Sequence, residues 1–311
     1  MQALATAVLP VFLLILLGYV IRRRGWIATA FWQPAEKLAY FFLLPALLTS
    51  TLAQADFSGL PAAAMAGAVV LAIAAMTVLL LLFHLLGSTR DGPALTALIQ
   101  TAIRPNTYIG LSIPFALYDE AGLTVAALAV AVVVPTVNLI SVTVLLRFGG
   151  HYVGQNPNQN QTTSLPRALL LNPMILSCLL GLALNLSGIG LPPVAGETLT
   201  ILARAALPLA LLAVGAGLDL GAAKASGGRV GAAVVLKLAG LPLLTAASCW
   251  LLGVDGLART VALIFAALPA ATSSYILARQ MGGAPGLVAN ILTVQTLAAA
   301  VTLPLLILFI T

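Results

Sequence analysis

The stretch TAIRPNTYIGLSIP, residues 101–114, carries side chains that can bind an anion inside a very apolar part of the chain. Its arginine, Arg104, has a guanidinium group whose donors match the two oxygens of a carboxylate. Pro105 and Pro114 each remove a backbone donor and clash with the preceding helical turn, and Gly110 lies between them. These residue types predict an anion-binding site at a break in a helix.

The composition of the chain predicts the surroundings of this segment. Of 311 residues, 61% are hydrophobic and 7% are charged, whereas soluble domains carry about 25% charged residues. Apolar runs of about twenty residues recur along the chain, and each is long enough to cross a hydrocarbon core of about 30 Å. We therefore expect an all-α polytopic membrane protein whose main partner is the lipid bilayer. The short alternating segments of a membrane β-barrel are absent from the sequence.

Hydropathy and turn signals predict ten transmembrane spans. Their ranges are 4–21, 33–52, 61–86, 94–118, 122–146, 168–187, 197–218, 229–252, 257–280 and 286–309. The basic residues of the loops after the odd-numbered spans are Arg22, Arg23, Arg24, Arg90, Arg147, Arg167, Lys224, Arg229 and Arg279. The loops after the even-numbered spans hold only Arg259. By the positive-inside rule, both termini lie on the non-cytoplasmic side of the membrane. The net charge of +6 thus reflects topology, and no nucleic-acid partner is expected.

Landmark residues recur at a near-constant offset along the chain. Pro45 falls on Pro208 at an offset of 163 residues, and Pro105 falls on Pro269 at an offset of 164. Two five-span repeats follow, and because five is odd the second repeat enters the membrane from the opposite side. Such inverted repeats are typical of secondary transporters. The first repeat, the polar cytoplasmic loop and the second repeat span residues 1–146, 147–167 and 168–311.

The depth of Arg104 demands a cavity or a partner. Its span starts near Pro93, and a rise of about 1.5 Å per residue places Arg104 about 17 Å deep, where a charge costs at least about 2.5–3.5 kcal/mol. The repeat predicts a second break at LPAATSSYILARQ, residues 268–280. Crossing broken helices in spans 4 and 9 would present amides and a helix N-terminus to an anion. The predicted substrate-binding residues are Arg104, Asn106, Tyr108, Ser112, Ser273, Ser274 and Tyr275, and the break residues are Pro105, Gly110, Pro114 and Pro269.

Structural alternatives stay open for several of these residues. Backbone carbonyls freed at the two breaks would be enough to hold Arg104. Asn106 and Tyr108 would then bond to local backbone, and the serines of span 9 would bond back to their own helix.

Other polar residues in the spans are less strongly predicted to contact a substrate. Asn138 and Gln295 are possible secondary ligands, although deep amides more often join helices. Lys237 and Arg204 are expected to extend their side chains to an interface. All eight acids lie at span ends or in loops. This placement disfavours coupling of transport to a titrating carboxylate in the pathway. Uniport of the anion, or a proton carried on the substrate itself, stays open as the mode of transport. Two isolated cysteines predict no metal site, and we expect no cofactor.

The chain resembles the bacterial branch of the auxin efflux carrier family along essentially its whole length. The motifs that carry the resemblance are RPNTYIGLSIPFALYDEAGL, NPMILSCLLGLALNLSGIGLP, ALPLALLAVGAGLDL and ALPAATSSYILARQMGG. The resemblance implies a fold similar to that of bile-acid symporters and sodium/proton antiporters, with a scaffold domain of spans 1, 2, 6 and 7 and a transport domain of spans 3–5 and 8–10. It also implies a bacterial inner membrane as the location, elevator-type alternating access, small organic anions such as malonate, malate or auxin as substrates, and a homodimer formed through the scaffold. Asn106 matches the family's asparagine that contacts the substrate carboxylate, whereas Ser274 and Tyr275 stand where plant members have a second proline.

Other functional classes fit the sequence less well. Asp119 and Asp219 lie in motifs similar to those of intramembrane aspartyl proteases, but at opposite ends of their spans, so the two carboxylates cannot meet. We therefore expect no enzyme. A sodium-coupled bile-acid-type symporter is the alternative among transporters, and sodium dependence of uptake would separate the two. The sequence as a whole predicts a secondary active or facilitated transporter of a small carboxylate.

Overall fold

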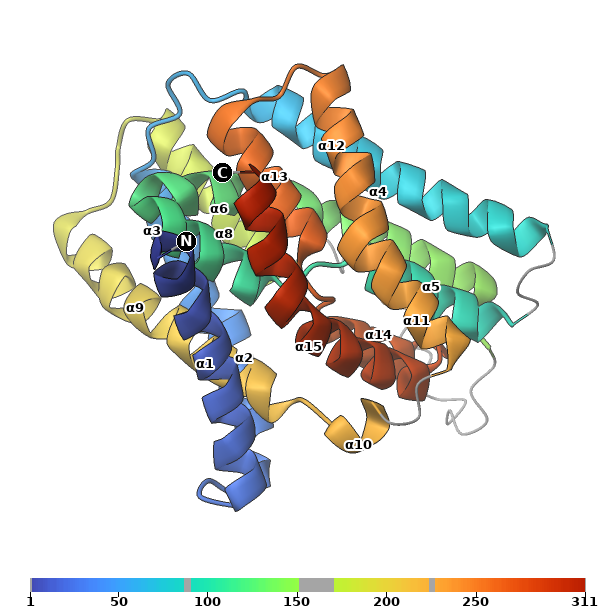
Figure 1. Cartoon of the computed structure of the whole chain (residues 1–311). Helices are drawn as coiled ribbons and strands as arrows, with labels where there is room; N and C mark the ends of the chain where they lie inside the picture. Colours follow the sequence, from blue (N-terminus) through green and yellow to red (C-terminus); the bar gives the residue numbers. More distant parts are fainter. Residues whose placement is uncertain (1, 87–90, 151–170, 224–226, 311) are drawn as a thin grey trace.

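The computed structural model describes residues 2–86, 91–150, 171–223 and 227–310, and these ranges are helices joined by short connections (Figure 1). Most of the predicted polar loop at 147–167 lies outside the described residues, as do Arg90, Arg167 and Lys224. The elements are α1 (Gln2–Arg24), α2 (Thr29–Leu38), the π-helical segment η1 (Ala39–Leu43), α3 (Leu44–Ala53), α4 (Ala62–Leu85), α5 (Gly92–Ile103), α6 (Thr107–Phe148), α8 (Pro173–Leu186), α9 (Pro193–Ala216), α10 (Leu220–Ala223), α11 (Gly228–Val235), the π-helical segment η2 (Leu236–Gly240), α12 (Leu241–Leu251), α13 (Gly256–Ala267), α14 (Ser273–Gln280) and α15 (Pro285–Ile310).

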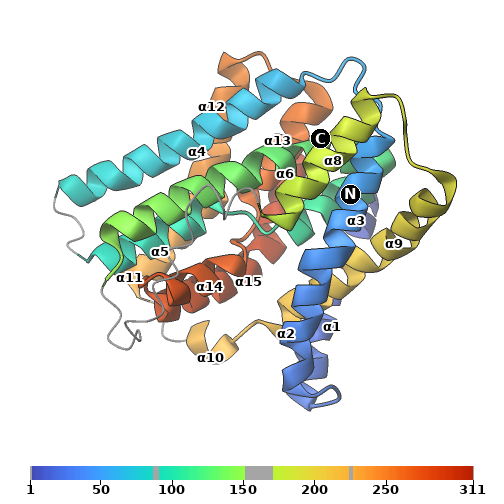
Figure 2. The ribbon, with the colours of Figure 1, turned by 180° about the vertical axis from the view of Figure 1, so that it is seen from behind.

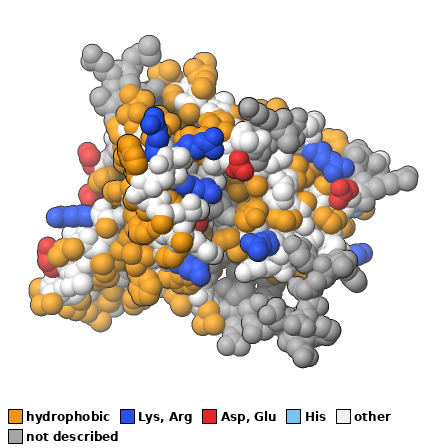
Figure 3. All heavy atoms as spheres, turned by 90° about the horizontal axis from the view of Figure 1, so that it is seen from below, with side chains coloured by type: hydrophobic (Ala, Val, Ile, Leu, Met, Phe, Trp, Pro, Cys, Tyr) orange, Lys and Arg blue, Asp and Glu red, His pale blue; other side chains and the backbone are white. Residues whose placement is uncertain are grey.

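Five helical stretches in the described part of the chain are long and apolar enough to cross a membrane. They are α4, α6, α9, α15 and the continuous run from α11 through η2 to α12, whereas α5, α8 and α13 are apolar but shorter. Hydrophobic side chains cover much of the face in Figure 3, with Lys and Arg at separate places on it. The chain is an all-helical, multi-pass membrane protein, as its composition predicts. The ten-span inverted repeat stays a prediction.

The helices form two groups at opposite sides of the molecule. In Figures 1 and 2, α1, α2, α3, α8 and α9 gather on one side, and α4, α5, α11 and α12 gather on the other. Small residues allow close packing in the first group, because a Cβ added to Gly18 or to Gly215 would overlap a backbone carbonyl of the facing helix, α9 or α1. Gly181 of α8 approaches α3 closely, since a Cβ there would lie 2.9 Å from the carbonyl oxygen of Thr49.

Two of the four predicted break residues lie where helices are interrupted, and the other two, Gly110 and Pro114, lie inside α6. α5 ends at Ile103 and α6 begins at Thr107, so Pro105 lies between helices, and Pro269 lies likewise between α13 and α14. The prediction that Pro114 breaks its helix is wrong, because Pro114 lies buried inside α6. The bend comes four residues later, at Tyr118 and at Asp119, whose φ is +49°.

Lys237 contradicts the expectation that its side chain reaches an interface. It lies in η2 and its side chain is fully buried, with no hydrogen-bond partner for Nζ within the described residues. The physical reason is that η2 packs against α5, α13 and α15, so its polar residue faces protein rather than lipid or water.

Candidate functional site

The two interrupted segments lie side by side and pair through their backbones. Pro105 and Ala270 form an antiparallel bridge. The amide N–H of Asn106 donates to the carbonyl of Pro269 at 2.8 Å, and that of Ala271 donates to the carbonyl of Arg104 at 3.1 Å. The non-helical backbone therefore finds partners within the protein, which is the condition for such backbone at membrane depth. We call residues 104–106 and 268–272 the crossover.

Gln295 of α15 holds the crossover to neighbouring helices. Its Oε1 accepts a hydrogen bond from the amide of Ala270 at 3.0 Å. Its Nε2 donates to the carbonyl of Ala233 at 3.0 Å and to that of Thr101 at 3.4 Å. All of these partners are backbone groups, so the structure places Gln295 in the joining role rather than in a ligand-binding one.

Gly110 allows α6 to pass close to the crossover. A Cβ at this residue would lie 2.7 Å from Cδ1 of Leu268 and 2.9 Å from Cζ of Phe265. Gly110 thus serves close packing within a continuous helical turn, and it does not itself interrupt α6.

Arg104 is a buried cation held by neutral partners. Its side chain is 7% exposed. Nη1 donates to Oδ1 of Asn138 at 2.9 Å and Nη2 donates to Oγ of Ser273 at 3.1 Å, while Nε has no partner among the described residues. The ion pairs of the described chain join Asp91 to Arg229 and Asp255 to Arg259, so Arg104 has no carboxylate partner there.

A cavity of about 450 Å³ opens beside this arginine, and we call it the Arg104 cavity. Its apolar wall comes from α6, including Val133, Val134 and Val137, and from Ile276 of α14. The predicted site residues that line it are Arg104, Asn106, Tyr108 and Ser273, together with the secondary candidate Asn138. Pro105 lines it as well.

Asn106 links the crossover to the start of α6. Its Oδ1 caps the helix by accepting hydrogen bonds from the amides of Tyr108 at 3.1 Å and Ile109 at 3.3 Å. The N-terminus of α6 therefore begins at the cavity wall, where its partial positive charge favours an anion.

Three predicted site residues do not line the Arg104 cavity. Ser112 lies on the wall of a second cavity, and its hydroxyl donates to the carbonyl of Tyr108 at 2.7 Å. Ser274 is fully buried with no partner for Oγ within the described residues, and Tyr275 is 37% exposed. The reason is helical geometry: α14 begins at Ser273, and successive residues of a helix point in directions about 100° apart.

The sequence analysis missed a polar stripe on α2 and η1. Gln33, Glu36, Lys37 and Tyr40 all line the Arg104 cavity, and Glu36 accepts a hydrogen bond from the hydroxyl of Thr272 at 2.6 Å. The sequence analysis placed all eight acids at span ends or in loops, but Glu36 lines the Arg104 cavity, because α2 begins at Thr29 and carries this residue two turns inward. The spacing i, i+3, i+4, i+7 of these residues could have predicted the stripe, because residues so spaced lie on one face of a helix.

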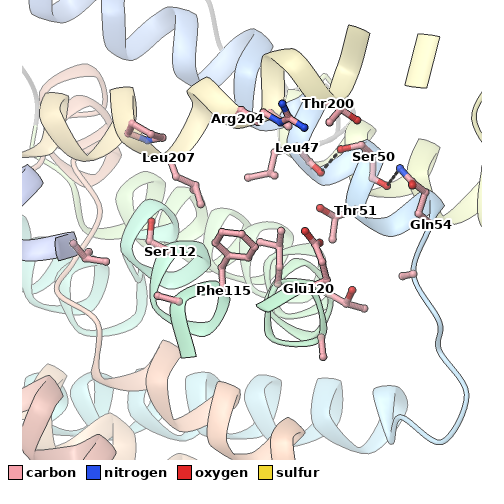
Figure 4. A pocket seen from close by; sticks show the side chains of 18 of the residues that line it. Leu47, Ser50, Thr51, Gln54, Ser112, Phe115, Glu120, Thr200, Arg204 and Leu207 are labelled. Carbon is pink, nitrogen blue, oxygen red and sulfur yellow. Dashed lines mark hydrogen bonds between the residues drawn. The ribbon is translucent and has the colours of Figure 1, made fainter. Parts of the chain in front are cut away.

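The second cavity is larger, about 1110 Å³, and we call it the Arg204 cavity. It lies among α1, α3, α6 and α9, and Figure 4 shows Ser50, Ser112, Phe115, Glu120 and Arg204 around it. Arg204, which was expected to extend its side chain to an interface, is exposed and lines this cavity. Asp56 and Glu120 line it too, so its charged residues are two acids and one base.

A single helical turn of α6 separates the two cavities. Tyr108 lines the Arg104 cavity, and Ser112, four residues later, lines the Arg204 cavity. The first turn of α6 after the crossover therefore has the Arg104 cavity on one side and the Arg204 cavity on the other.

The comparison with protein families agrees with this architecture. The family model described as "Membrane transport protein" matches residues 3–307. No curated protein matches the chain. The motifs around the two breaks lie inside the matched region, and the resemblance inferred from them is confirmed. The chain belongs to the membrane transport protein family, the family of auxin efflux carrier-type transporters.

Proposed function

We propose that the protein is a secondary carrier of a small organic anion, such as malonate or malate, and that the anion binds in the Arg104 cavity. The observation that carries this proposal is the state of Arg104: a buried guanidinium on a cavity wall, held by an amide and a hydroxyl and with no carboxylate partner in the described chain. A buried charge without a counter-charge is costly, and an anion in the cavity would supply one.

The size and chemistry of the cavity support a small carboxylate. About 450 Å³ lies within the range of small-molecule sites. The amide of Asn138 and the hydroxyls of Tyr108 and Ser273 can donate to further oxygens, while the valines of α6 suit a short carbon chain.

Transport by alternating access is supported by the placement of the two cavities. The Arg204 cavity is lined by α1, α3 and α9 on one side and by α6 on the other, and the Arg104 cavity lies between α2 with η1 and the crossover. Both cavities thus lie between the predicted scaffold and the predicted transport domain. We propose that spans 3–5 and 8–10, arranged as an inverted repeat, move as a block against the scaffold and carry the site from one side of the membrane to the other.

Thermal stability of the purified protein with matched ligands tests the proposal. We expect malonate and malate to raise the melting temperature, and malonamide, which has the shape of malonate without its charge, to leave it unchanged. Arg104→Ala should remain folded and lose the response, because the cation is gone. Equal stabilisation by malonamide, or no response of the folded wild-type protein to any carboxylate, would refute the proposed function. The same measurement with sodium replaced by potassium tests the alternative function, because a sodium-coupled symporter would lose the stabilisation by malonate in potassium.

A further inference from the structure

Glu36 is a carboxylate inside the proposed anion site. It lies on the wall of the Arg104 cavity and is half-buried. Its Oε1 accepts the 2.6 Å hydrogen bond from Oγ1 of Thr272, which joins α2 to the crossover across most of the sequence. A fixed negative charge in this place would repel the very anion that Arg104 attracts.

No cation in the described chain neutralises Glu36 by an ion pair, since the ion pairs there involve other residues. The charged or titratable residues that share its cavity are Lys37 on α2, Tyr40 on η1, and Arg104 and Tyr108 at the crossover. Arg104 is committed to Asn138 and Ser273.

Within the described residues, the other elements packed against α2 bring no counter-charge into the cavity. α9 contacts α2 through Ala213 and Ala216, which pack on Trp32. Its own charged residues are distant from that contact: Arg204 lines the other cavity, and Glu197 lies about 24 Å along the helix from Ala213. Arg22 of α1, near the same contact, donates to the carbonyl of Ala216.

Two carboxylates in one small cavity repel each other, and binding one proton relieves the repulsion. The partner of Glu36 suits both forms. A threonine hydroxyl donates to a carboxylate, as it does here, and accepts from a protonated carboxyl group after a rotation about its C–O bond. The hydrogen bond between α2 and the crossover can therefore persist in either state.

We propose, building on the anion-carrier function above, that Glu36 binds a proton when the anion binds, so that the protein carries its anion together with a proton. The proton comes from the water on the side to which the cavity is open and forms an O–H bond with the carboxylate of Glu36. It leaves to water on the other side together with the anion. No bond of the substrate is broken, and the charge of one carboxylate is balanced by the proton.

Isothermal titration of malonate in buffers of different ionisation enthalpy tests this, because it counts the protons taken up per malonate bound. Between about pH 5.5 and pH 7.5 we expect the wild-type protein to take up as much as about one proton more than Glu36→Gln, which keeps the shape of the side chain without its charge. Thr272→Val retains the carboxylate and should retain the uptake. Glu197→Gln, the same substitution outside both cavities, should match the wild type.

The outcomes separate the two proposals. Malonate binding with equal proton uptake in wild type and Glu36→Gln overturns the role of Glu36 and leaves the carrier function standing. Absence of malonate binding to the folded wild-type protein counts against both.

A second measurement needs only the wild-type chain. In liposomes that enclose a pH-sensitive dye, malonate added outside should acidify the lumen faster than in protein-free liposomes. Malonate uptake without this acidification also overturns the proposal.

Discussion

The Arg104 cavity and the Arg204 cavity share α6 as a wall but differ in size and charge. The first measures about 450 Å³ and is lined by two cations, Lys37 and Arg104, and one acid, Glu36. The second measures about 1110 Å³ and is lined by one cation, Arg204, and two acids, Asp56 and Glu120. The smaller cavity thus combines the size of a small-molecule site with an excess of positive charge, whereas the larger one has an excess of negative charge.

Under the proposed function, this difference favours the Arg104 cavity as the site that holds the anion and the Arg204 cavity as the opening through which it passes. Arg104 is buried and fixed by two side-chain hydrogen bonds, so its donors are oriented before a ligand arrives. Arg204 is exposed, and its charge is offset in the same cavity by acids. A site with a fixed cation retains an anion, whereas a wide cavity with net negative charge releases it.

Removing one arginine from each cavity is the strongest test of this comparison. Arg104→Ala should weaken malonate binding roughly 100-fold, since charge-assisted hydrogen bonds contribute about 1.5–3 kcal/mol each. Arg204→Ala should change the affinity by less than about threefold, because an exposed charge is screened by water and salt. Binding isotherms of the two folded variants provide the measurement, and a larger loss from Arg204→Ala would reverse the assignment of the cavities.

Two side-chain amides that join helices, Gln295, which is buried, and Asn185, which is half-buried, give the next largest effect. Gln295→Leu leaves the amide of Ala270 without a partner and removes the hydrogen bonds to the carbonyls of Thr101 and Ala233. We expect it to lower the free energy of unfolding by about 1–3 kcal/mol and to weaken malonate binding as well. Asn185→Leu removes comparable hydrogen bonds to the carbonyls of Ala53 and Ala55, which lie on the side of the Arg204 cavity.

Asn185→Leu should therefore destabilise the fold without changing the affinity for malonate. Thermal unfolding and binding measured on the same samples separate the two effects. Loss of affinity in both variants would mean that binding follows general stability rather than the geometry of the crossover.

The interruptions of the crossover could be predicted from the sequence. Hydropathy and paired prolines located them at Pro105 and Pro269, because a proline removes a backbone hydrogen bond from the helix. At Pro105 the neighbouring charge of Arg104, which is costly at membrane depth, was a second signal. Pro114 misled the prediction, because a proline within a helix can be accommodated by neighbouring packing when the chain bends elsewhere.

Side-chain directions were harder to predict than breaks. Glu36 escaped notice because hydropathy places a residue in depth but does not tell which face of the helix meets a cavity. Ser274 and Tyr275 were grouped with Ser273 by proximity in sequence, although the helix that starts there turns them away. Lys237 was assigned to an interface by its distance from the span end, and only the packing of η2 shows that it is buried.

The acids of the Arg204 cavity should affect the rate of transport rather than affinity. Glu120→Gln removes a negative charge from the passage, so we expect malonate to cross about two to five times faster at low ionic strength, with the difference fading as salt screens the field. Initial rates in liposomes at two salt concentrations measure this. A tighter equilibrium affinity in the variant would instead make Glu120 part of the binding site.

The smallest expected effect concerns two aspartates, Asp91 and Asp56, and the dependence of the melting temperature on pH. Asp91 caps α5, the helix that leads to Arg104, and the backbone hydrogen bond from Ala94, followed by the pairing with Arg229, lowers the pKa of its carboxyl group. Because the pKa is lower in the folded state than in the unfolded one, Asp91 stabilises the fold above about pH 4, and this contribution is lost as the pH falls through the folded pKa.

Asp91→Asn keeps the cap and removes the charge, so the melting temperature should depend less on pH in the acid range. At neutral pH the cost should stay below about 1 kcal/mol, as for other exposed pairs. Asp56, at the Arg204 cavity, has its pKa lowered by hydrogen bonds to Ser58, but the group is fully exposed and organises only a local turn. Asp56→Asn should therefore change the acid range of the melting curve less than Asp91→Asn, since the exposed charge of Asp56 is screened by solvent. A larger effect from Asp56→Asn than from Asp91→Asn would show that the Arg204 side limits the stability of the fold.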